Sequence, residues 1–319
     1  APWPREDMHS EPSSLPSTPS KGFSRQTTAS TVASVSSFAG DDVFERSMTP
    51  LPSTLEASSQ GVQGRVRQLC QKEAGCRLVQ SAIDACTSDQ ERNSLAQEMA
   101  GHVWAAVRCP FGNYVIQRFV TMLRPQDCQF IIEEISSQGK RAALQLARHR
   151  YGCRIMQRLL EHVRPEQMRS MTESLLREGV QLARHQYGNF VMQRVLSHGT
   201  PAQQRQLCKL LQPYTADLAT DENGSAVLAM ALAHACREDR QALVQTLLTQ
   251  PGLLPAVSKT RHGHRTALAL FQGLEGEEMV TAVEILRSNL PSLSNSRYGR
   301  VVQLGPTRQA GERLSLIHI

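Results

Sequence analysis

Apolar residues between about residue 61 and residue 305 recur at helical spacing, and no strand-like alternation is sustained anywhere in the chain. An amphipathic stretch, for example the one with Met99, Val103 and Val107, precedes a glycine, and a second stretch of roughly ten residues follows it. The second stretches carry adjacent apolar pairs: Val115 with Ile116, Ile155 with Met156, and Val191 with Met192. Prolines without an N–H, which can end a helix, come after these stretches at Pro125, Pro165 and Pro201. The pattern predicts pairs of helices in series and an all-α fold.

The glycines between the paired stretches form a repeat. Seven of them are separated by 37, 40, 36, 36, 39 and 36 residues: Gly75, Gly112, Gly152, Gly188, Gly224, Gly263 and Gly299. The two most similar copies, LARHRYGCRIMQR at 146–158 and LARHQYGNFVMQR at 182–194, agree at nine of thirteen positions. A period of this length is typical of an α-solenoid, in which each repeat buries its apolar face against its neighbours.

The residues just after the glycine combine polar and flat side chains in the first four repeats. Positions one and five after the glycine lie one turn apart on the same face of a helix, and position two lies between them. These positions form the four post-glycine sets: Cys76, Arg77 and Gln80; Asn113, Tyr114 and Gln117; Cys153, Arg154 and Gln157; and Asn189, Phe190 and Gln193. A nucleic-acid base needs a flat surface on which to stack and polar groups at its Watson–Crick edge. The pattern therefore predicts an exposed helical face that binds bases.

With the motifs GCRLVQ, GNYVIQ, GCRIMQ and GNFVMQ at this period, the chain from about residue 61 to residue 305 resembles the Pumilio (PUF) family of RNA-binding proteins. The resemblance implies a right-handed α-solenoid of Pumilio-type repeats that reads one base per repeat, with the RNA antiparallel to the protein. It further implies that Asn and Gln around an aromatic side chain read uracil, and that Cys with Arg and Gln reads adenine. The four post-glycine sets, taken from the fourth to the first, would then read 5′-UAUA-3′.

The later repeats depart from this pattern, so base reading by them is left open. The family usually has eight repeats, and only seven are found here, the last of them incomplete. The departing residues are Ser225, Ala226 and Ala229; His264, Arg265 and Leu268; and Arg300 with Val301. The basic segment RHGHR at 261–265 could attract phosphate, although we interpret it as a solvated loop.

Simpler interpretations remain open for some residues of the sets. Asn113 and Asn189 could be helix N-caps, although capping does not account for a glutamine four residues later in all four repeats. Tyr114 and Phe190 could be core aromatics, although the neighbouring apolar pairs already fill the inward face.

Nearby charged residues also allow two interpretations. Arg118, Arg158 and Arg194 could approach phosphates or form salt bridges between repeats. His149 and His185, which precede the glycine, are interpreted as structural.

Composition divides the chain into three parts. Residues 1–60 are dense in Ser, Thr and Pro and are predicted to be a disordered arm, with Thr18-Pro19 and Thr49-Pro50 as possible proline-directed phosphorylation sites. The Pumilio-like repeat domain is predicted over 61–311. The segment LSLIHI at 314–319 is what CTGTCTCTTATACACATC would encode, a sequence that resembles a transposase end used in sequencing libraries, and we interpret it as a cloning or assembly scar.

The net charge of +6 and the pI near 9.0 favour an anionic partner without choosing its kind. The eight cysteines are scattered without a CxxC pair and are interpreted as reduced thiols of an intracellular protein, and Cys76 and Cys153 alone would be ordinary buried thiols. No enzyme motif and no metal-ligand spacing is found, so neither catalysis nor a cofactor is expected. No apolar run approaches the ~18 residues of a membrane span.

The resemblance implies a cytoplasmic monomer that binds single-stranded RNA in mRNA 3′ untranslated regions. It would lower translation or mRNA stability through effector proteins of translational repression or deadenylation. Two alternatives stay open: a protein-binding α-solenoid of the armadillo or HEAT kind, and a Pumilio-like ribosome-biogenesis factor, which would be nucleolar and of low sequence specificity.

Overall fold

The computed structural model describes residues 59–303, which are largely helical and contain no β-strand within that range. For these residues the all-α prediction is confirmed. Residues 1–58 of the predicted arm, including Thr18 and Thr49, lie outside the described residues. Residues 304–311 of the predicted repeat domain and residues 314–319 also lie outside them.

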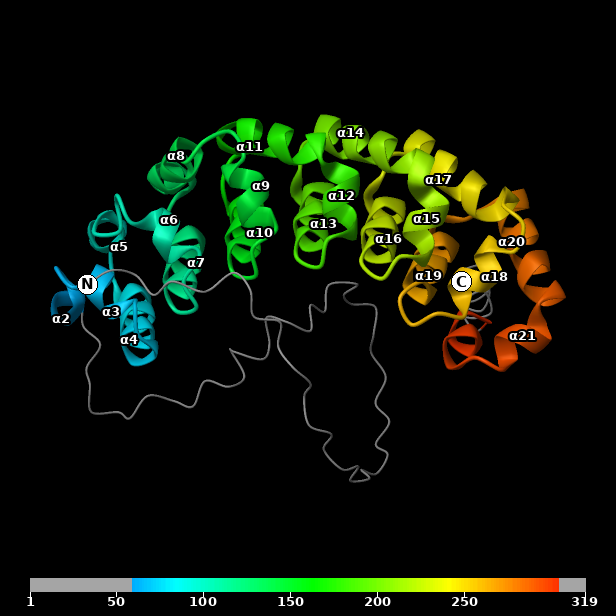
Figure 1. Ribbon diagram of the computed structural model, residues 1–319, viewed down its shortest axis with the longest axis horizontal. Coiled ribbons are helices and arrows are strands. Elements are labelled where there is room, and N and C mark those ends of the chain that lie inside the picture. The colour runs from blue at the N-terminus through cyan, green and yellow to red at the C-terminus, as the bar shows by residue number, and fades with distance from the viewer. Residues whose placement is uncertain (1–58, 304–319) are drawn as a thin grey trace, which may run out of the picture. The chain divides into compact units, whose positions relative to one another are not determined.

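The first six repeats each contribute a helix that contains or directly follows the repeat glycine, and we call these the glycine helices. They are α4 (Glu73–Ala85), α7 (Gly112–Met122), α10 (Gly152–His162), α13 (Gly188–His198), α16 (Gly224–His234) and α19 (His264–Gly273). Consecutive glycine helices contact one another from α4 to α19, and Figure 1 shows them as one row.

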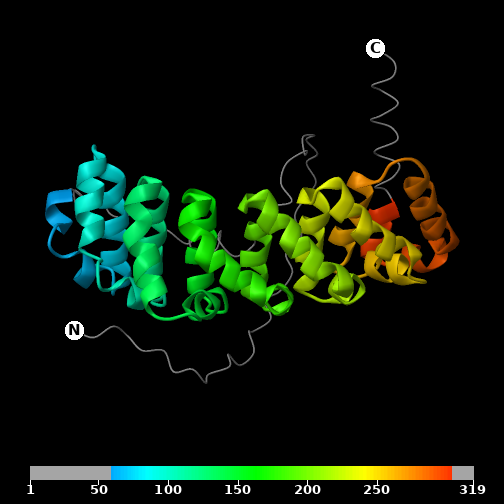
Figure 2. The ribbon, with the colours of Figure 1, turned by 90° about the horizontal axis from the view of Figure 1, so that it is seen from above.

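A second row, the backing helices, packs behind the first (Figure 1). It consists of α5 (Asp89–Gln97), α8 (Gln129–Ser137), α11 (Pro165–Arg177), α14 (Pro201–Leu211), α17 (Arg237–Thr249) and α20 (Gly276–Ser288). Figure 2 shows the two rows from above, with the repeats following one another in chain order.

Short helices precede the repeat glycines, and all but the first of them follow a backing helix. They are α3 (Val66–Leu69), α6 (Val103–Ala106), α9 (Ala142–Ala147), α12 (Gly179–Arg184), α15 (Thr215–Thr220), α18 (Leu253–Ser258) and α21 (Leu290–Ser294). The remaining elements are α2 (Ser59–Val62) and two 3₁₀ turns, η1 (Pro125–Cys128) and η2 (Gln212–Tyr214).

The repeat glycines lie where a glycine helix meets the short helix before it. A Cβ atom on Gly188 would lie 2.9 Å from both Cδ2 and the carbonyl oxygen of Leu182, and one on Gly152 would lie 2.7 Å from Cδ2 of Leu146. Both distances are well below the roughly 3.5–4.0 Å of a comfortable carbon contact. Leu146 and Leu182 are fully buried and cannot move aside. The glycine period in the sequence therefore marks a close approach of two helices.

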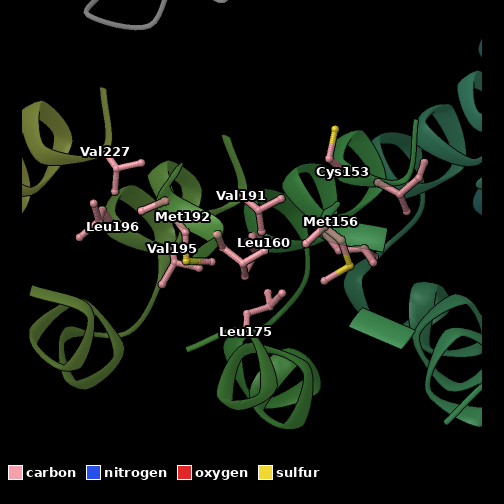
Figure 3. Close-up of a cluster of buried hydrophobic side chains, with 14 of the residues drawn as sticks. Cys153, Met156, Leu160, Leu175, Val191, Met192, Val195, Leu196 and Val227 are labelled. Carbon is pink, nitrogen blue, oxygen red and sulfur yellow. The ribbon is translucent and has the colours of Figure 1, made fainter. Parts of the chain in front are cut away.

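The hydrophobic core runs between the two rows of helices. Figure 3 shows Met156 and Leu160 of α10, Leu175 of α11, and Met192 and Val195 of α13 gathered in one such cluster. These side chains are at most 8% exposed, as the apolar pairs in the sequence predict. Because the core takes up the apolar face of each glycine helix, the opposite face stays available for polar contacts.

The prolines follow the glycine helices, as predicted, but they have a different role from the predicted one. Pro165 and Pro201 are the first residues of α11 and α14, and Pro125 begins η1, so they start the backing segment rather than end the glycine helix. A first helical position suits proline, because its missing N–H would have no partner there.

Candidate RNA-binding surface

The four post-glycine sets lie on α4, α7, α10 and α13, four glycine helices that contact their neighbours in series. Flat groups of adjacent sets approach each other across the repeat boundary. The guanidinium carbon of Arg154 lies 5.8 Å from the ring centroid of Phe190, within the range of a cation–π contact. The fold thus brings residues that are 36 positions apart in the sequence into one continuous surface.

The first residue of each set is buried, and the prediction that both edge-reading side chains are exposed is wrong at this position. Asn113 is 1% exposed and Asn189 is 2% exposed, and Cys76 and Cys153 are 1% exposed. Gln157 and Gln193 are nearly buried as well, at 3% and 8%.

The physical reason is that the asparagine side chain folds back onto the loop before the helix. Nδ2 of Asn113 donates to the carbonyl oxygens of Cys109, at 2.8 Å, and Pro110, at 2.9 Å. Nδ2 of Asn189 donates in the same way to His185, at 2.9 Å, and Gln186, at 3.0 Å. The asparagine therefore ties the start of the helix to the loop before it, and the carbonyl oxygens of Cys109 and His185 also accept from its backbone N–H.

The glutamine of each set is held by the first residue of the same set. Nε2 of Gln117 donates to Oδ1 of Asn113 at 2.9 Å, and Nε2 of Gln193 donates to Oδ1 of Asn189 at 3.0 Å. In the cysteine sets, Nε2 of Gln157 donates to the carbonyl oxygen of Cys153 at 3.0 Å, and Nε2 of Gln80 lies 3.1 Å from Sγ of Cys76.

The amide oxygen, Oε1, of each glutamine is available to a ligand. Within residues 59–303, Oε1 accepts no hydrogen bond in any of the four sets: Gln80, Gln117, Gln157 and Gln193. None of these oxygens is among the buried, unpaired polar atoms of the described residues, so each one reaches solvent. Each set thereby presents one oriented acceptor, which can take an N–H from the Watson–Crick edge of a base.

The flat side chains of the sets are half-buried rather than fully exposed. Tyr114 packs partly against the hydrophobic core, and Phe190 is also of intermediate exposure. Arg77 forms an ion pair with Glu73, with 2.6 Å between Nη2 and Oε1, which holds its guanidinium along α4. The stacking surface is consequently restrained before any base arrives.

Helix capping is carried out by a different position, three residues before the glycine. Nδ1 of His149 accepts from the N–H groups of Tyr151, at 3.2 Å, and Gly152, at 3.1 Å. Nδ1 of His185 accepts from Tyr187, at 3.1 Å, and Gly188, at 3.2 Å. The capping interpretation of Asn113 and Asn189 is therefore wrong, because these side chains donate to loop carbonyls instead.

The same position keeps an acceptor in the later repeats, where the residue type changes. Oδ1 of Asp221 accepts from Gly224 at 2.7 Å, Oγ1 of Thr260 accepts from Gly263 at 2.9 Å, and Oγ of Ser296 accepts from Gly299 at 3.4 Å. The structural interpretation of the two histidines agrees with this role. The sequence signal was the recurrence of His, Asp, Thr and Ser at one position, which the sequence analysis did not use.

The arginines that follow the sets are engaged in ion pairs. Arg118 pairs with Asp84 of the preceding repeat, and Arg194 pairs with Glu161 of the preceding repeat, with 2.6 Å between Nε and Oε1. Nη1 of Arg158 lies 2.9 Å from Oε2 of Glu161 in its own helix. The interpretation of salt bridges between repeats therefore describes Arg118 and Arg194, whereas Arg158 pairs within its own helix.

The cysteines are free thiols, as the sequence analysis interprets them. Burial raises the pKa of Cys76 to about 12, so its side chain is an uncharged thiol at neutral pH. No group of three or more His, Cys, Asp or Glu side chains that could hold a metal ion occurs among residues 59–303. Over the same residues, no helix is both long and apolar enough to cross a membrane.

A sequence model of the Pumilio-family RNA binding repeat matches residues 65–100, 108–136, 143–176 and 179–211. Each match contains one post-glycine set. The chain belongs to the Pumilio (PUF) family. Pumilio proteins are RNA-binding proteins and not enzymes, which is the class that the sequence analysis expects. The four matches end at residue 211, before the repeats that have lost the glutamine.

Pumilio relatives and solved Pumilio domains resemble the chain as follows. A Pumilio domain-containing protein of Schizosaccharomyces pombe is 28% identical over 102 residues, which are 32% of this chain and 14% of the relative. Pumilio homolog 1 of Xenopus laevis is 30% identical over 106 residues, 33% of this chain and 8% of the relative. The chain thus spans less than a fifth of the length of either relative.

The structural likeness extends further along the chain. The structure of PUF-8 in complex with PBE-RNA has a TM-score of 0.68 at 20% identity, covering 78% of this chain and 73% of that chain. The Puf3 RNA binding domain bound to a Cox17 RNA 3′ UTR recognition sequence has the same TM-score and identity, with 76% and 74% covered. This likeness shows that the α-solenoid is the fold of Pumilio domains.

Proposed function

We propose that this Pumilio protein binds single-stranded RNA sequence-specifically, with one base at each of the four post-glycine sets. The observation that carries the proposal is the arrangement of the glutamines, whose Nε2 is anchored while Oε1 reaches solvent. A half-buried flat side chain lies beside each of them. An oriented acceptor next to a stacking surface meets both needs of a base.

The preferred core is 5′-UAUA-3′, with the RNA antiparallel to the protein. The second and fourth sets place an asparagine amide below the glutamine and are assigned to uracil, and the first and third place a cysteine side chain there and are assigned to adenine. This assignment follows the Pumilio resemblance, and the alternation of amide and thiol along one surface supports it.

The biological setting belongs to the same proposal. The protein is a cytoplasmic monomer that binds 3′ untranslated regions of mRNA and lowers translation or stability by recruiting effector proteins. A Puf3 domain of the same fold binds a 3′ UTR recognition sequence, which supports this choice of target.

The test is a binding assay with two RNAs of equal composition, CCCUAUACCC and CCCUUAACCC. They differ at two bases, and a well-made edge contact discriminates by roughly 1–3 kcal/mol per base in the DNA case. The UAUA sequence should therefore bind at least tenfold tighter. Equal affinity for the two RNAs would contradict base reading and favour the low-specificity, ribosome-biogenesis alternative.

A further inference from the structure

The repeats beyond the fourth set have the same fold but lack the side chains that would read a base. Ser225 and Ala229 of α16 are 1% and 2% exposed and offer neither a flat group nor an amide. In the next repeat, Leu268 stands where the glutamine stands in the first four. The surface of these repeats must therefore contact RNA by other means or not at all.

Cations gather around the last two repeat glycines. Segments 253–265 and 290–303 contain no acidic residue. Together they carry five basic residues, which we call the C-terminal basic cluster: Lys259, Arg261, Arg265, Arg297 and Arg300. A carboxylate of the preceding repeat, that of Glu222, has its Oε1 3.6 Å from Nε2 of His262, and within residues 59–303 it does not pair with any arginine of the cluster.

The arginines of the cluster differ from those of the first repeats in their partners. The side chains of Arg261, Arg265 and Arg297 are exposed and make no hydrogen bond or ion pair within residues 59–303. Arg118 and Arg194, by contrast, are paired with carboxylates of the preceding repeat. The cluster thus has free guanidinium groups, each able to hold a phosphate through two parallel N–H bonds.

The two segments that carry the cluster are fixed to each other. The ring of His264 stacks on that of Tyr298, with centroids 4.9 Å apart and planes tilted by 31°. Oγ of Ser296 donates to the carbonyl oxygen of Lys259 at 2.9 Å, and Nζ of Lys259 donates to Oγ of Ser292 at 2.8 Å. His264 occupies the position of the first residue of a post-glycine set, so this position braces two repeats. These contacts hold the backbone that carries the arginines of the cluster in place.

The cluster continues the line of the four post-glycine sets. Helix α19 contacts α16, and α16 contacts α13, which carries the fourth set. Under the proposed function the 5′ side of the RNA leaves the fourth set in this direction. At one nucleotide per repeat, the strand passes α16 unread and then reaches the residues around Gly263 and Gly299.

We propose that the C-terminal basic cluster binds the phosphates of the RNA immediately 5′ of the UAUA core, irrespective of base sequence. This inference rests on the proposed function and adds a second mode of contact to it. Four bases are read at their edges, and the three nucleotides before them are held by their backbone. A phosphodiester is the ligand because the cluster offers cations without a reading amide.

The test compares UAUACCC with CCCUAUACCC and with the same longer RNA carrying three abasic residues in place of the 5′ cytidines. The variant is R261A/R265A/R297A. The control is R169A/R177A/R287A, which removes the same charge from exposed arginines on α11 and α20 that make no ion pair within the described residues. Thermal unfolding of both variants checks that the fold is retained.

For the wild type, the 5′ extension should tighten binding and add about 2 to the slope of log affinity against log salt, at roughly 0.7 for each of three neutralised phosphates. This slope corresponds to a further loss of roughly 16-fold between 50 and 200 mM salt. The abasic extension should tighten binding to the same extent. The control variant should gain as much affinity from the extension as the wild type does, whereas R261A/R265A/R297A should gain none.

An extension without effect on the wild type, a gain that survives in R261A/R265A/R297A, or an abasic extension that gives no gain would each overturn the proposal. Failure of the proposed function has a different signature, because the UAUA and UUAA cores would then bind equally with the extension present.

Discussion

The coupling between Asn189 and Gln193 is the feature of the site that can be tested most quantitatively. Asn189 donates two hydrogen bonds to loop carbonyls, at 2.9 and 3.0 Å, and accepts one from Gln193 at 3.0 Å. At roughly 1 kcal/mol for each buried hydrogen bond, we expect Asn189→Ala to lower the free energy of unfolding by about 2 to 3 kcal/mol. Gln193→Ala should lower it by about 1 kcal/mol.

The effects on RNA affinity should not be additive. If Asn189 holds the amide of Gln193 in the orientation that meets the base, Asn189→Ala already removes much of the contribution of Gln193. The coupling energy in binding should then be about 1 kcal/mol, so the double variant should bind about fivefold tighter than the two single losses predict.

The assay is a double-mutant cycle by fluorescence anisotropy with a labelled UAUA RNA, with urea unfolding of each protein to confirm that it is folded. The matched control pairs Asn189→Ala with Gln80→Ala, a glutamine of the first set, and this pair should be additive within roughly 0.5 kcal/mol. A coupling between Asn189 and Gln193 no larger than in the control would refute the view that one side chain orients the other.

Three further predictions concern the flat side chains, a later repeat and pH. Tyr114→Ala should weaken RNA binding by roughly 1–3 kcal/mol through lost stacking and also lower thermal stability, because Tyr114 packs against the core; unchanged affinity in a folded variant would remove it from the site. Leu268→Ala should leave RNA affinity nearly unchanged, whereas Gln117→Ala should reduce it; equal losses would show that the later repeat reads a base. Burial, with nearby Arg148, lowers the pKa of His185, so its stabilising contribution is present above pH 6.5 and is lost as the pH falls below that value. His185→Asn keeps an acceptor that does not titrate, and urea unfolding should show a smaller loss of stability than wild type between pH 7 and pH 5.5; parallel losses would contradict the capping role.

The architecture could be predicted from the sequence because it depends on local periodicities. The apolar pairs mark the buried face of each glycine helix, and the glycine period marks the contact of Gly152 and Gly188 with buried leucines. Both signals repeat with the chain, so they identify the solenoid before any tertiary contact is known.

The detail of the site was less accessible, because it depends on contacts that a helical wheel does not contain. A wheel places Asn189 and Gln193 on one face, but it cannot show that the loop at His185 and Gln186 closes over the asparagine. The pairing of Arg194 with Glu161 likewise crosses a repeat boundary. The sequence identified the residues, whereas their division into a buried anchor and an accessible acceptor required the structure.

The central claim, that the post-glycine sets touch bases, is tested most directly by rewriting one of them. The double change Asn189→Ser with Gln193→Glu replaces the amide by a carboxylate that only accepts hydrogen bonds. A serine fits the buried first position, as Ser225 shows in the next repeat. Guanine offers N1–H and its 2-amino group as neighbouring donors, whereas uracil would set a carbonyl oxygen against the negative charge.

The measurement is a competition between 5′-GAUA-3′ and 5′-UAUA-3′ in otherwise identical RNAs, for the wild type and the double variant. At roughly 1–3 kcal/mol for one edge contact, the variant should prefer GAUA by about ten- to hundredfold, while the wild type prefers UAUA. A folded variant that keeps the wild-type preference for UAUA would show that the set of Asn189 and Gln193 does not read the base.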